Sequence, residues 1–237
     1  MGLFVLIHSP LVGPLTWSLV ADELQRRGIQ VVVPTLFTDP KVGPPYWKQH
    51  VNAVARALEP VSLDQPLILV GHSGAGVLLP AIRQTTDRLV AAYVLVDADI
   101  PKNGASRLDL FEPPEAADQF RQTASNGFLP IWSEDALRQV IEDVGLRQRF
   151  VTELRPLPLA VYEEPIPVFN SWPDASCGYM RFTSTSSYEG SGRQAQRKGW
   201  TYVEIEGRHF HMLVGPRTVA HALVNLAERM GIAASKK

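Results

Sequence analysis

The feature that most constrains this chain is an apolar run that enters a turn of very small residues. Four apolar residues lead directly into Gly-His-Ser-Gly-Ala-Gly at positions 71–76. A buried strand that turns sharply into a helix can raise a serine hydroxyl out of the sheet, provided that the residues two before and two after it are small. Gly71 and Ala75 meet this requirement. The pattern predicts a strained Ser73 with an exposed hydroxyl and with the N–H of Gly74 facing the same space.

Two phosphate-binding patterns fit these six residues less well. A dinucleotide-binding turn has the spacing Gly-x-Gly-x-x-Gly, whereas the spacing here is Gly-x-x-Gly-x-Gly. A P-loop continues with Lys and Ser or Thr after its last glycine, and here Val77 and Leu78 follow. The turn therefore favours a nucleophilic serine, and we expect no cofactor because side chains supply the nucleophile and the base.

Length and composition limit the classes of protein that remain. A chain of 237 residues is long enough for one α/β domain with a sizeable insertion. The formal net charge is -1 and basic residues do not cluster, so we expect no nucleic-acid partner. The longest apolar runs are far below the ~20 residues that cross a bilayer, so we expect no membrane partner. The single cysteine, Cys177, fits a reducing compartment. We expect a cytoplasmic protein with a small-molecule substrate, and a homodimer is among the assemblies left open.

Apolar strands alternate with amphipathic helices along most of the chain. The strands are expected at residues 3–7, 29–33, 67–70, 89–96, 178–183 and 200–205. This alternation predicts an α/β fold, with a mostly parallel sheet of about six strands that helices flank on both faces.

The alternation stops after residue 101. Residues 102–172 are rich in proline, show helical spacing at 116–123 and 134–154, and contain no strong strand. We predict that residues 1–101 and 173–237 form the core, and that residues 102–172 form a helical cap inserted into it.

Ser73 needs a base to remove its proton. The best candidate is His209, which lies between the last expected strand and the last expected helix, at the edge where open α/β sheets hold their sites. His211 is the competitor. His72 is expected to border the substrate, with the alternative that it anchors loop backbone at the end of its strand.

Three segments in chain order resemble the α/β-hydrolase superfamily. They are Val-Leu-Ile-His-Ser-Pro at positions 5–10, the turn at 71–75 and Gly-Arg-His at 207–209. The resemblance extends over nearly the whole chain, and the early start of the first strand is similar to the small branch with plant methylesterases and hydroxynitrile lyases. It implies that Ser73 is the nucleophile, that His209 is the base, and that the loop after the first strand forms part of an oxyanion hole.

The oxyanion loop departs from the family pattern. The family usually has His-Gly-x here, and the residue x donates its N–H, whereas this chain has Pro10 at that place. Proline has no N–H to donate. Beside the N–H of Gly74, we therefore expect the second donor to be the N–H of Leu11 or the hydroxyl of Ser9.

The acidic residue that should orient His209 also departs from the family pattern. The family usually places it just after the strand at 178–183, but that loop holds no aspartate, and Glu189 comes late. Asp97 and Asp99 follow the previous strand, where haloalkane dehalogenases carry a working carboxylate. We favour Asp97, with Asp99 and Glu189 as alternatives, although aspartate at a strand end also commonly caps a turn.

The expected cap is rich in aromatic residues. They are Phe111, Phe120, Phe128, Trp132 and Phe150. Most are expected to pack the cap's own core, whereas Trp132 is expected to line a hydrophobic substrate pocket.

The resemblance implies a serine hydrolase that cleaves an ester of a small apolar substrate through an acyl-enzyme. A thioesterase would use the same steps. A hydroxynitrile-lyase-like enzyme that cleaves a C–C bond would need a cation in the pocket, and no lysine has a compelling place there. The alternative from another class is a ligand-binding protein that keeps the fold without turnover.

Overall fold

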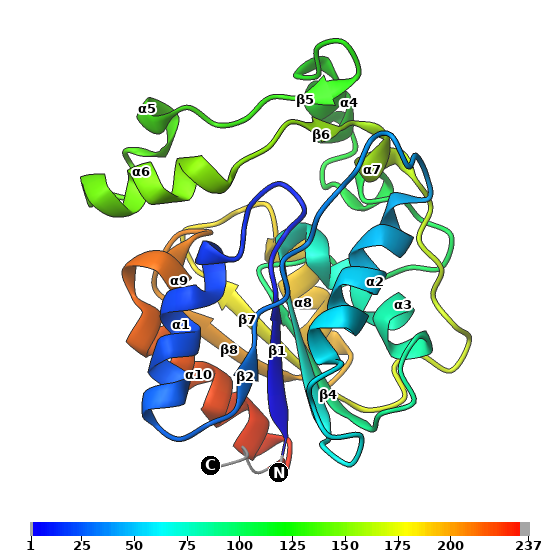
Figure 1. Ribbon diagram of the computed structural model, residues 1–237, viewed down its shortest axis with the longest axis vertical. Helices are drawn as coiled ribbons and strands as arrows, with labels where there is room; N and C mark the ends of the chain where they lie inside the picture. The colour runs from blue at the N-terminus through cyan, green and yellow to red at the C-terminus, as the bar shows by residue number, and fades with distance from the viewer. Residues whose placement is uncertain (1, 233–237) are drawn as a thin grey trace.

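The computed structural model of the protein describes residues 2–232 and is built on a six-stranded sheet (Figure 1). The order of the strands is β2-β1-β3-β4-β7-β8, and every pairing between them is parallel. Their bounds are β1 Leu3–Ile7, β2 Val31–Val32, β3 Leu67–His72, β4 Val90–Val96, β7 Ser176–Phe182 and β8 Thr201–Ile205. The predicted α/β fold is confirmed. The strand expected at 29–33 shrinks to two residues because it is an edge strand that pairs with β1 only at Val31 and Val32.

Helices cover both faces of this sheet. On one face lie α1 (Leu15–Arg26), α9 (His211–Val214) and α10 (Pro216–Arg229), and on the other lie α2 (Tyr46–Leu58), α3 (Leu79–Gln84) and α8 (Glu189–Arg197) (Figure 1). Side chains of β1 divide between the two faces, because successive residues of a strand point to opposite sides. Phe4 and Leu6 join the core under α1 and α10, whereas Val5 and Ile7 join the core under α2 and α3.

The chain changes direction across the sheet between β1 and β3. From β1 it moves outward to β2, and it then returns to β3 on the other side of β1. Open α/β sheets leave a crevice beyond the carboxyl ends of the strands at such a switch point. The loops after β1 and β3, which contain Ser9 and Ser73, meet at this crevice.

The turn after β3 depends on small residues. A 3₁₀ helix (Ser73–Leu78) follows the strand directly and leads into α3. A Cβ atom on Gly71 would lie 2.9 Å from the Cα of Gly76, and one on Gly76 would lie 2.7 Å from the Cβ of Ala98. The backbone after Ser73 therefore folds back onto β3 and the end of β4 more closely than any side chain would allow.

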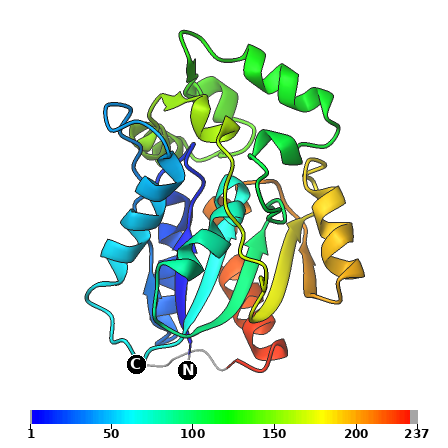
Figure 2. The same cartoon turned by 90° about the vertical axis from the view of Figure 1, so that its right-hand side faces the viewer.

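Most residues between β4 and β7 lie above the carboxyl ends of the strands, and the stretch after α7 then runs down beside the core to the start of β7 (Figures 1 and 2). The elements are a 3₁₀ helix (Leu108–Leu110), α4 (Glu115–Gln122), β5 (Phe128–Leu129), α5 (Glu134–Leu137), α6 (Val144–Glu153), β6 (Leu157–Pro158) and α7 (Ala160–Glu163). Among these helices, β5 and β6 form a short antiparallel pair that places Leu129 opposite Leu157. Strands of two residues are too short to show alternation in a sequence. The division into core and cap at residues 101 and 173 stays a prediction.

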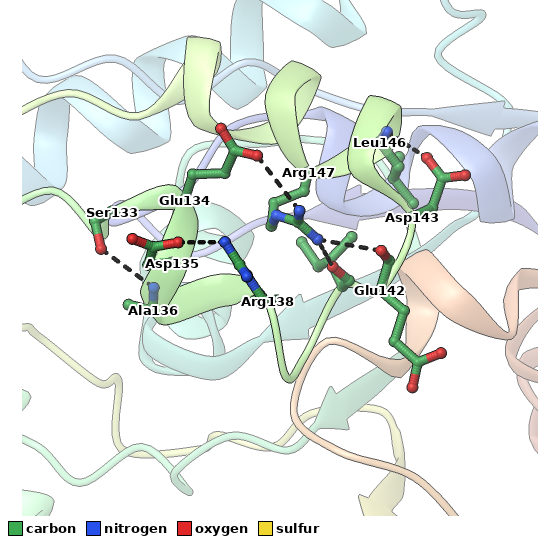
Figure 3. Close-up of polar contacts among 10 residues, drawn as sticks. Ser133, Glu134, Asp135, Ala136, Arg138, Glu142, Asp143, Leu146 and Arg147 are labelled. Carbon is green, nitrogen blue, oxygen red and sulfur yellow. Dashed lines mark hydrogen bonds and ion pairs between the residues drawn. The ribbon is translucent and has the colours of Figure 1, made fainter.

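The helix expected at 134–154 is two helices, since each has its own N-cap. Ser133 accepts a hydrogen bond from the N–H of Ala136 at the start of α5, and Asp143 accepts one from the N–H of Leu146 at the start of α6 (Figure 3). Side chains that accept from the first turn stabilise a helix start. These caps set the break between α5 and α6.

The buried guanidinium of Arg147 holds this break together (Figure 3). It donates to the carbonyl oxygens of Ile141 at 2.7 Å and Glu142 at 3.1 Å, and it pairs with the carboxylate of Glu134 at 3.4 Å. At the far end of α6, the carboxylate of Glu153 accepts the N–H of Leu15, 2.8 Å away at the start of α1. This hydrogen bond thus attaches the segment formed by α5 and α6 to helix α1 of the core.

Within residues 2–232, no helix is both long and apolar enough to cross a membrane.

Candidate active site

A cavity of about 340 Å³ opens above the carboxyl ends of β1 and β3, beneath the segment between β4 and β7. Ten of the residues singled out from the sequence line it, namely Ser9, Leu11, His72, Ser73, Gly74, Asp99, Phe111, Phe120, Trp132 and His209. The structure thus brings together side chains from the loops after β1, β3 and β8.

Ser73 has the strained backbone that its turn predicts. Its φ of 54° lies in the left-handed region, which residues other than glycine seldom adopt. Its hydroxyl, however, is not in open solvent, because the residue is only 8% exposed and its Oγ lies 3.0 Å from the hydroxyl of Tyr188. The expectation of an exposed hydroxyl is wrong in this respect, since Tyr188 covers Ser73 from the start of α8.

His209 is held by a buried carboxylate. Its Nδ1 donates to Oδ2 of Asp97 at 3.0 Å, and the other oxygen of Asp97 accepts the N–H of Phe182 at 2.9 Å. Asp97 is fully buried and has a φ of 43°, so its backbone is strained as well. Because the proton is held on Nδ1, Nε2 is the ring nitrogen of His209 that can accept another proton.

The other candidate acids have different partners. Asp99 lines the cavity and accepts a hydrogen bond from Ser191 at 3.1 Å, and burial raises the pKa of its carboxyl to about 7. Glu189 is exposed and pairs with Arg193. Of the three carboxylates considered, Asp97 is the one that contacts His209.

His211, the competing base, does not line this cavity. Its ring packs against Phe182 at 5.8 Å and between Gly207 and Gly215, and burial lowers its pKa. His211 therefore has a packing environment outside the site.

His72 borders the cavity and also anchors backbone. Its ring is fully buried, and its Nε2 donates to the carbonyl oxygen of His209 at 3.0 Å. Burial and the neighbouring His209 hold the pKa of His72 well below its ordinary value, so its ring stays neutral. This hydrogen bond matches the alternative expectation that His72 anchors loop backbone, because it holds the backbone of His209 in place.

The oxyanion side of the cavity is formed around Gly74. The N–H of Leu11 donates, at 3.4 Å, to Oγ of Ser9. A Cβ atom on Gly74 would lie 2.9 Å from the hydroxyl of Tyr162 and 3.2 Å from Oγ of Ser9, so both hydroxyls stand directly over Gly74. The Leu11 N–H is thus used inside its own loop, whereas the Ser9 hydroxyl faces the turn that carries Ser73.

Arg107 links this turn to the overlying segment. Its side chain is buried, and it donates to the carbonyl oxygens of Gly74 at 2.8 Å and Val161 at 2.6 Å. Its guanidinium also lies 5.6 Å from the centre of the Tyr162 ring.

Sequence reasoning missed Tyr188, Arg107 and Tyr162. The loop after β7 is where the family pattern places a functional residue, and this position alone could have directed attention to Tyr188. No local pattern marks the other two residues.

The wall opposite the polar residues is aromatic. Phe111, Phe120 and Trp132 line the cavity, and Trp132 packs edge-on against Phe210 at 5.5 Å. Phe150 is fully buried and contacts Phe210, and Phe128 is partly exposed. Trp132 is the aromatic residue expected to line a substrate pocket, and Phe111 and Phe120 join it there. These two also pack against each other and against Tyr162.

The fold agrees with the comparisons to known proteins. Residues 4–222 match the model of the alpha/beta hydrolase family, and the chain belongs to that family. The sequence is 29% identical over 131 residues to a carbendazim hydrolyzing esterase from Nocardioides sp. (strain SG-4G). That match covers 51% of this chain and 52% of the esterase, so it spans about half the length of this curated relative.

Solved structures share the fold over almost the whole chain. An extracellular alpha/beta-hydrolase from a Paenibacillus species, described as homologous to tobacco salicylic acid binding protein 2, has a TM-score of 0.77 at 21% identity, covering 95% of this chain and 99% of that one. A pyrethroid hydrolase from Sphingobium faniae JZ-2 has a TM-score of 0.73 at 17% identity, covering 96% and 97%. Polyneuridine aldehyde esterase has a TM-score of 0.70 at 17% identity, covering 96% and 99%.

Proposed function

We propose that this protein is a serine hydrolase that cleaves an ester bond of a small, largely apolar substrate through an acyl-enzyme. The observation that carries the proposal is the hydrogen bond from His209 to the buried Asp97, at the same cavity as the strained Ser73. A serine and a histidine at one cavity, with a buried carboxylate hydrogen-bonded to that histidine, are the parts of a catalytic triad. Relatives named as esterases and hydrolases support the reaction class.

Each residue of the site has a role in this reaction. Ser73 attacks the carbonyl carbon while Nε2 of His209 takes its proton, and Asp97 stabilises the imidazolium that results. The N–H of Gly74 and the hydroxyl of Ser9 stabilise the oxyanion. His209 then protonates the leaving group. In the second half of the reaction, water attacks the acyl carbon while His209 takes a proton from it, and Oγ of Ser73 leaves with that proton.

The size and the lining of the cavity support the proposal that the substrate has a compact, apolar acyl or alkyl group. Its volume of about 340 Å³ lies near the lower end of the range for small-molecule sites, and Phe111, Phe120 and Trp132 provide an aromatic wall. Cleavage of a C–C bond is less well supported, because no lysine among residues 2–232 lines this cavity and Arg107 donates to two backbone carbonyls. The cytoplasmic location and the oligomeric state stay predictions.

Fluorophosphonate labelling followed by peptide mapping tests the proposal. The expected result is one adduct on Ser73, which is lost in Ser73→Ala together with hydrolysis of p-nitrophenyl esters. Acyl chains of increasing length, with acyl-CoA esters beside them, separate an esterase from a thioesterase. If folded protein binds small esters but Ser73 does not react, the chain is a binding protein and the hydrolase assignment fails.

A further inference from the structure

We propose that Tyr188 is a catalytic residue whose hydroxyl donates a hydrogen bond to Oγ of Ser73 while that oxygen attacks the substrate. This inference rests on the proposed function, because it concerns the same nucleophile. Nothing in the family pattern of the sequence points to a tyrosine at this place. The inference follows from three contacts of the side chain.

The first two contacts fix the hydroxyl and the ring. The hydroxyl oxygen of Tyr188 lies 3.0 Å from Oγ of Ser73. The ring of Tyr188 stacks on the ring of His209, with centroids 5.2 Å apart and planes inclined by 15°. Tyr188 thus touches both groups between which the proton moves, and it lines the cavity that receives the substrate.

The third contact fixes the backbone of Tyr188. This residue is the N-cap of α8, and its carbonyl oxygen accepts the N–H of Gly192 at 2.9 Å. The hydroxyl of Tyr179 lies 3.5 Å from the same oxygen and donates to the carbonyl of Ala98 at 2.8 Å. Tyr188 is therefore held from its own helix and from β7, so its hydroxyl is preorganised toward Ser73.

The hydrogen bond has a defined direction during the reaction. Burial and the nearby carboxyl of Asp99 keep the pKa of Tyr188 well above its ordinary value, so its hydroxyl keeps a proton to donate. The proton of Ser73 has to point at His209, which leaves Oγ free to accept from Tyr188. Negative charge builds on Oγ as His209 removes its proton, and again when Oγ leaves the acyl carbon during deacylation, so a donor fixed at Oγ in advance stabilises these two stages.

The proton balance of the attack is simple. The O–H bond of Ser73 breaks and its proton passes to Nε2 of His209, while Oγ forms a bond to the acyl carbon. The π electron pair of the carbonyl moves to its oxygen. Tyr188 keeps its own proton throughout, so no further reactant is needed, and His209 later gives the transferred proton to the leaving alcohol.

The experiment compares Tyr188→Phe with the unaltered protein in fluorophosphonate labelling and ester hydrolysis. Phenylalanine keeps the ring that stacks on His209 and removes only the hydroxyl. We expect the labelling rate and kcat to fall roughly 100-fold with little change in KM, the size of effect that one preorganised donor commonly has. Tyr202→Phe is the matched control, because the hydroxyl of Tyr202 contacts Glu204 and does not line the cavity. We expect this control to label at the original rate.

A second variant, with 3-fluorotyrosine at position 188, preserves the shape of the side chain and guards against loss of folding. Fluorine makes the phenol a stronger hydrogen-bond donor, and burial keeps this phenol protonated. We expect this variant to label at least as fast as the unaltered protein, whereas Tyr188→Phe labels roughly 100-fold more slowly. A purely structural Tyr188 would give equal labelling rates in the two variants.

The outcomes separate this inference from the proposed function. If the unaltered protein labels at Ser73 and Tyr188→Phe labels equally fast or faster, the role of Tyr188 is overturned and the hydrolase assignment stands. Equal labelling rates in the fluorotyrosine variant and in Tyr188→Phe overturn it in the same way. If the unaltered protein does not label at all, the proposed function fails, and the inference about Tyr188 fails with it.

Discussion

Nδ1 of His209 lies 3.0 Å from Oδ2 of Asp97, although 112 residues separate the two along the chain. Asp97 directly follows β4 and His209 follows β8, and only β7 lies between these strands in the sheet. Parallel strands bring their carboxyl ends to one edge, so residues from distant segments meet there. The contact passes directly over β7, because Asp97 also accepts the N–H of Phe182 at the end of that strand.

Replacing Asp97 with Asn tests this pairing. The amide keeps the shape of the side chain but favours the wrong tautomer of His209, so we expect kcat for ester hydrolysis to fall roughly 10³- to 10⁴-fold. Glu189→Gln is the control, since Glu189 is exposed and contacts Arg193 instead. Steady-state kinetics and a thermal melt of each variant provide the measurement. A greater loss in Glu189→Gln than in Asp97→Asn would assign the acid to the loop after β7.

Replacing Ser9 with Ala tests the oxyanion side. The Ser9 hydroxyl stands over Gly74, and removal of one oxyanion donor commonly lowers kcat by roughly 10²- to 10³-fold. We expect a loss of this size in Ser9→Ala and partial recovery in Ser9→Thr, which restores a hydroxyl. Equal kcat values in the unaltered protein and in Ser9→Ala would contradict this role for Ser9 and would favour the N–H of Leu11 as the second oxyanion donor.

Replacing Gly71 with Ala tests the packing of the turn. A Cβ atom here would meet backbone atoms of Gly76 at 2.9 and 3.0 Å, which cannot move aside as a flexible side chain can. We expect the free energy of unfolding to fall by about 1–3 kcal/mol, as for other overpacked sites. Urea denaturation measures the change.

Gly145→Ala in α6 is the matched control for Gly71→Ala. The nearest contact of its new Cβ is 3.5 Å, and alanine favours a helix over glycine by up to about 1 kcal/mol. We expect this substitution to be neutral or stabilising. A Gly71→Ala protein as stable as Gly145→Ala would show that the turn tolerates a side chain.

Asp99 makes stability depend on pH. Burial raises the pKa of its carboxyl from 3.8 to about 7, so between these values the folded protein binds more protons than the unfolded chain. The contribution of Asp99 to stability is therefore present at about pH 4 and is lost as the pH rises toward 7. In Asp99→Asn this loss is absent, so we expect the melting temperature to depend less on pH between 4 and 7. Parallel pH profiles of the two proteins would exclude a raised pKa at Asp99.

Part of the site could be predicted from short segments of sequence. The small residues around Ser73 form a local requirement of one turn, and the place of His209 after the last strand puts it at the carboxyl edge of any parallel sheet. The preference for Asp97 rested on its place at the end of a strand, and the structure puts that residue against His209. The alternation of strands and helices was sufficient to predict the fold class, because the hydrophobic period and the length of each element can be read from a short segment of sequence.

Tertiary structure alone decided the surroundings of the nucleophile. Tyr188, Arg107 and Tyr162 come from three segments with no shared pattern, and their contacts with Ser73 and Gly74 depend on how α8 and the segment after β4 fold over the sheet. The same holds for the pairing of β5 with β6, which joins residues about 29 positions apart. Local sequence determines which backbone conformations are accessible, but contacts between distant segments depend on the burial of shared surfaces, which no single segment specifies.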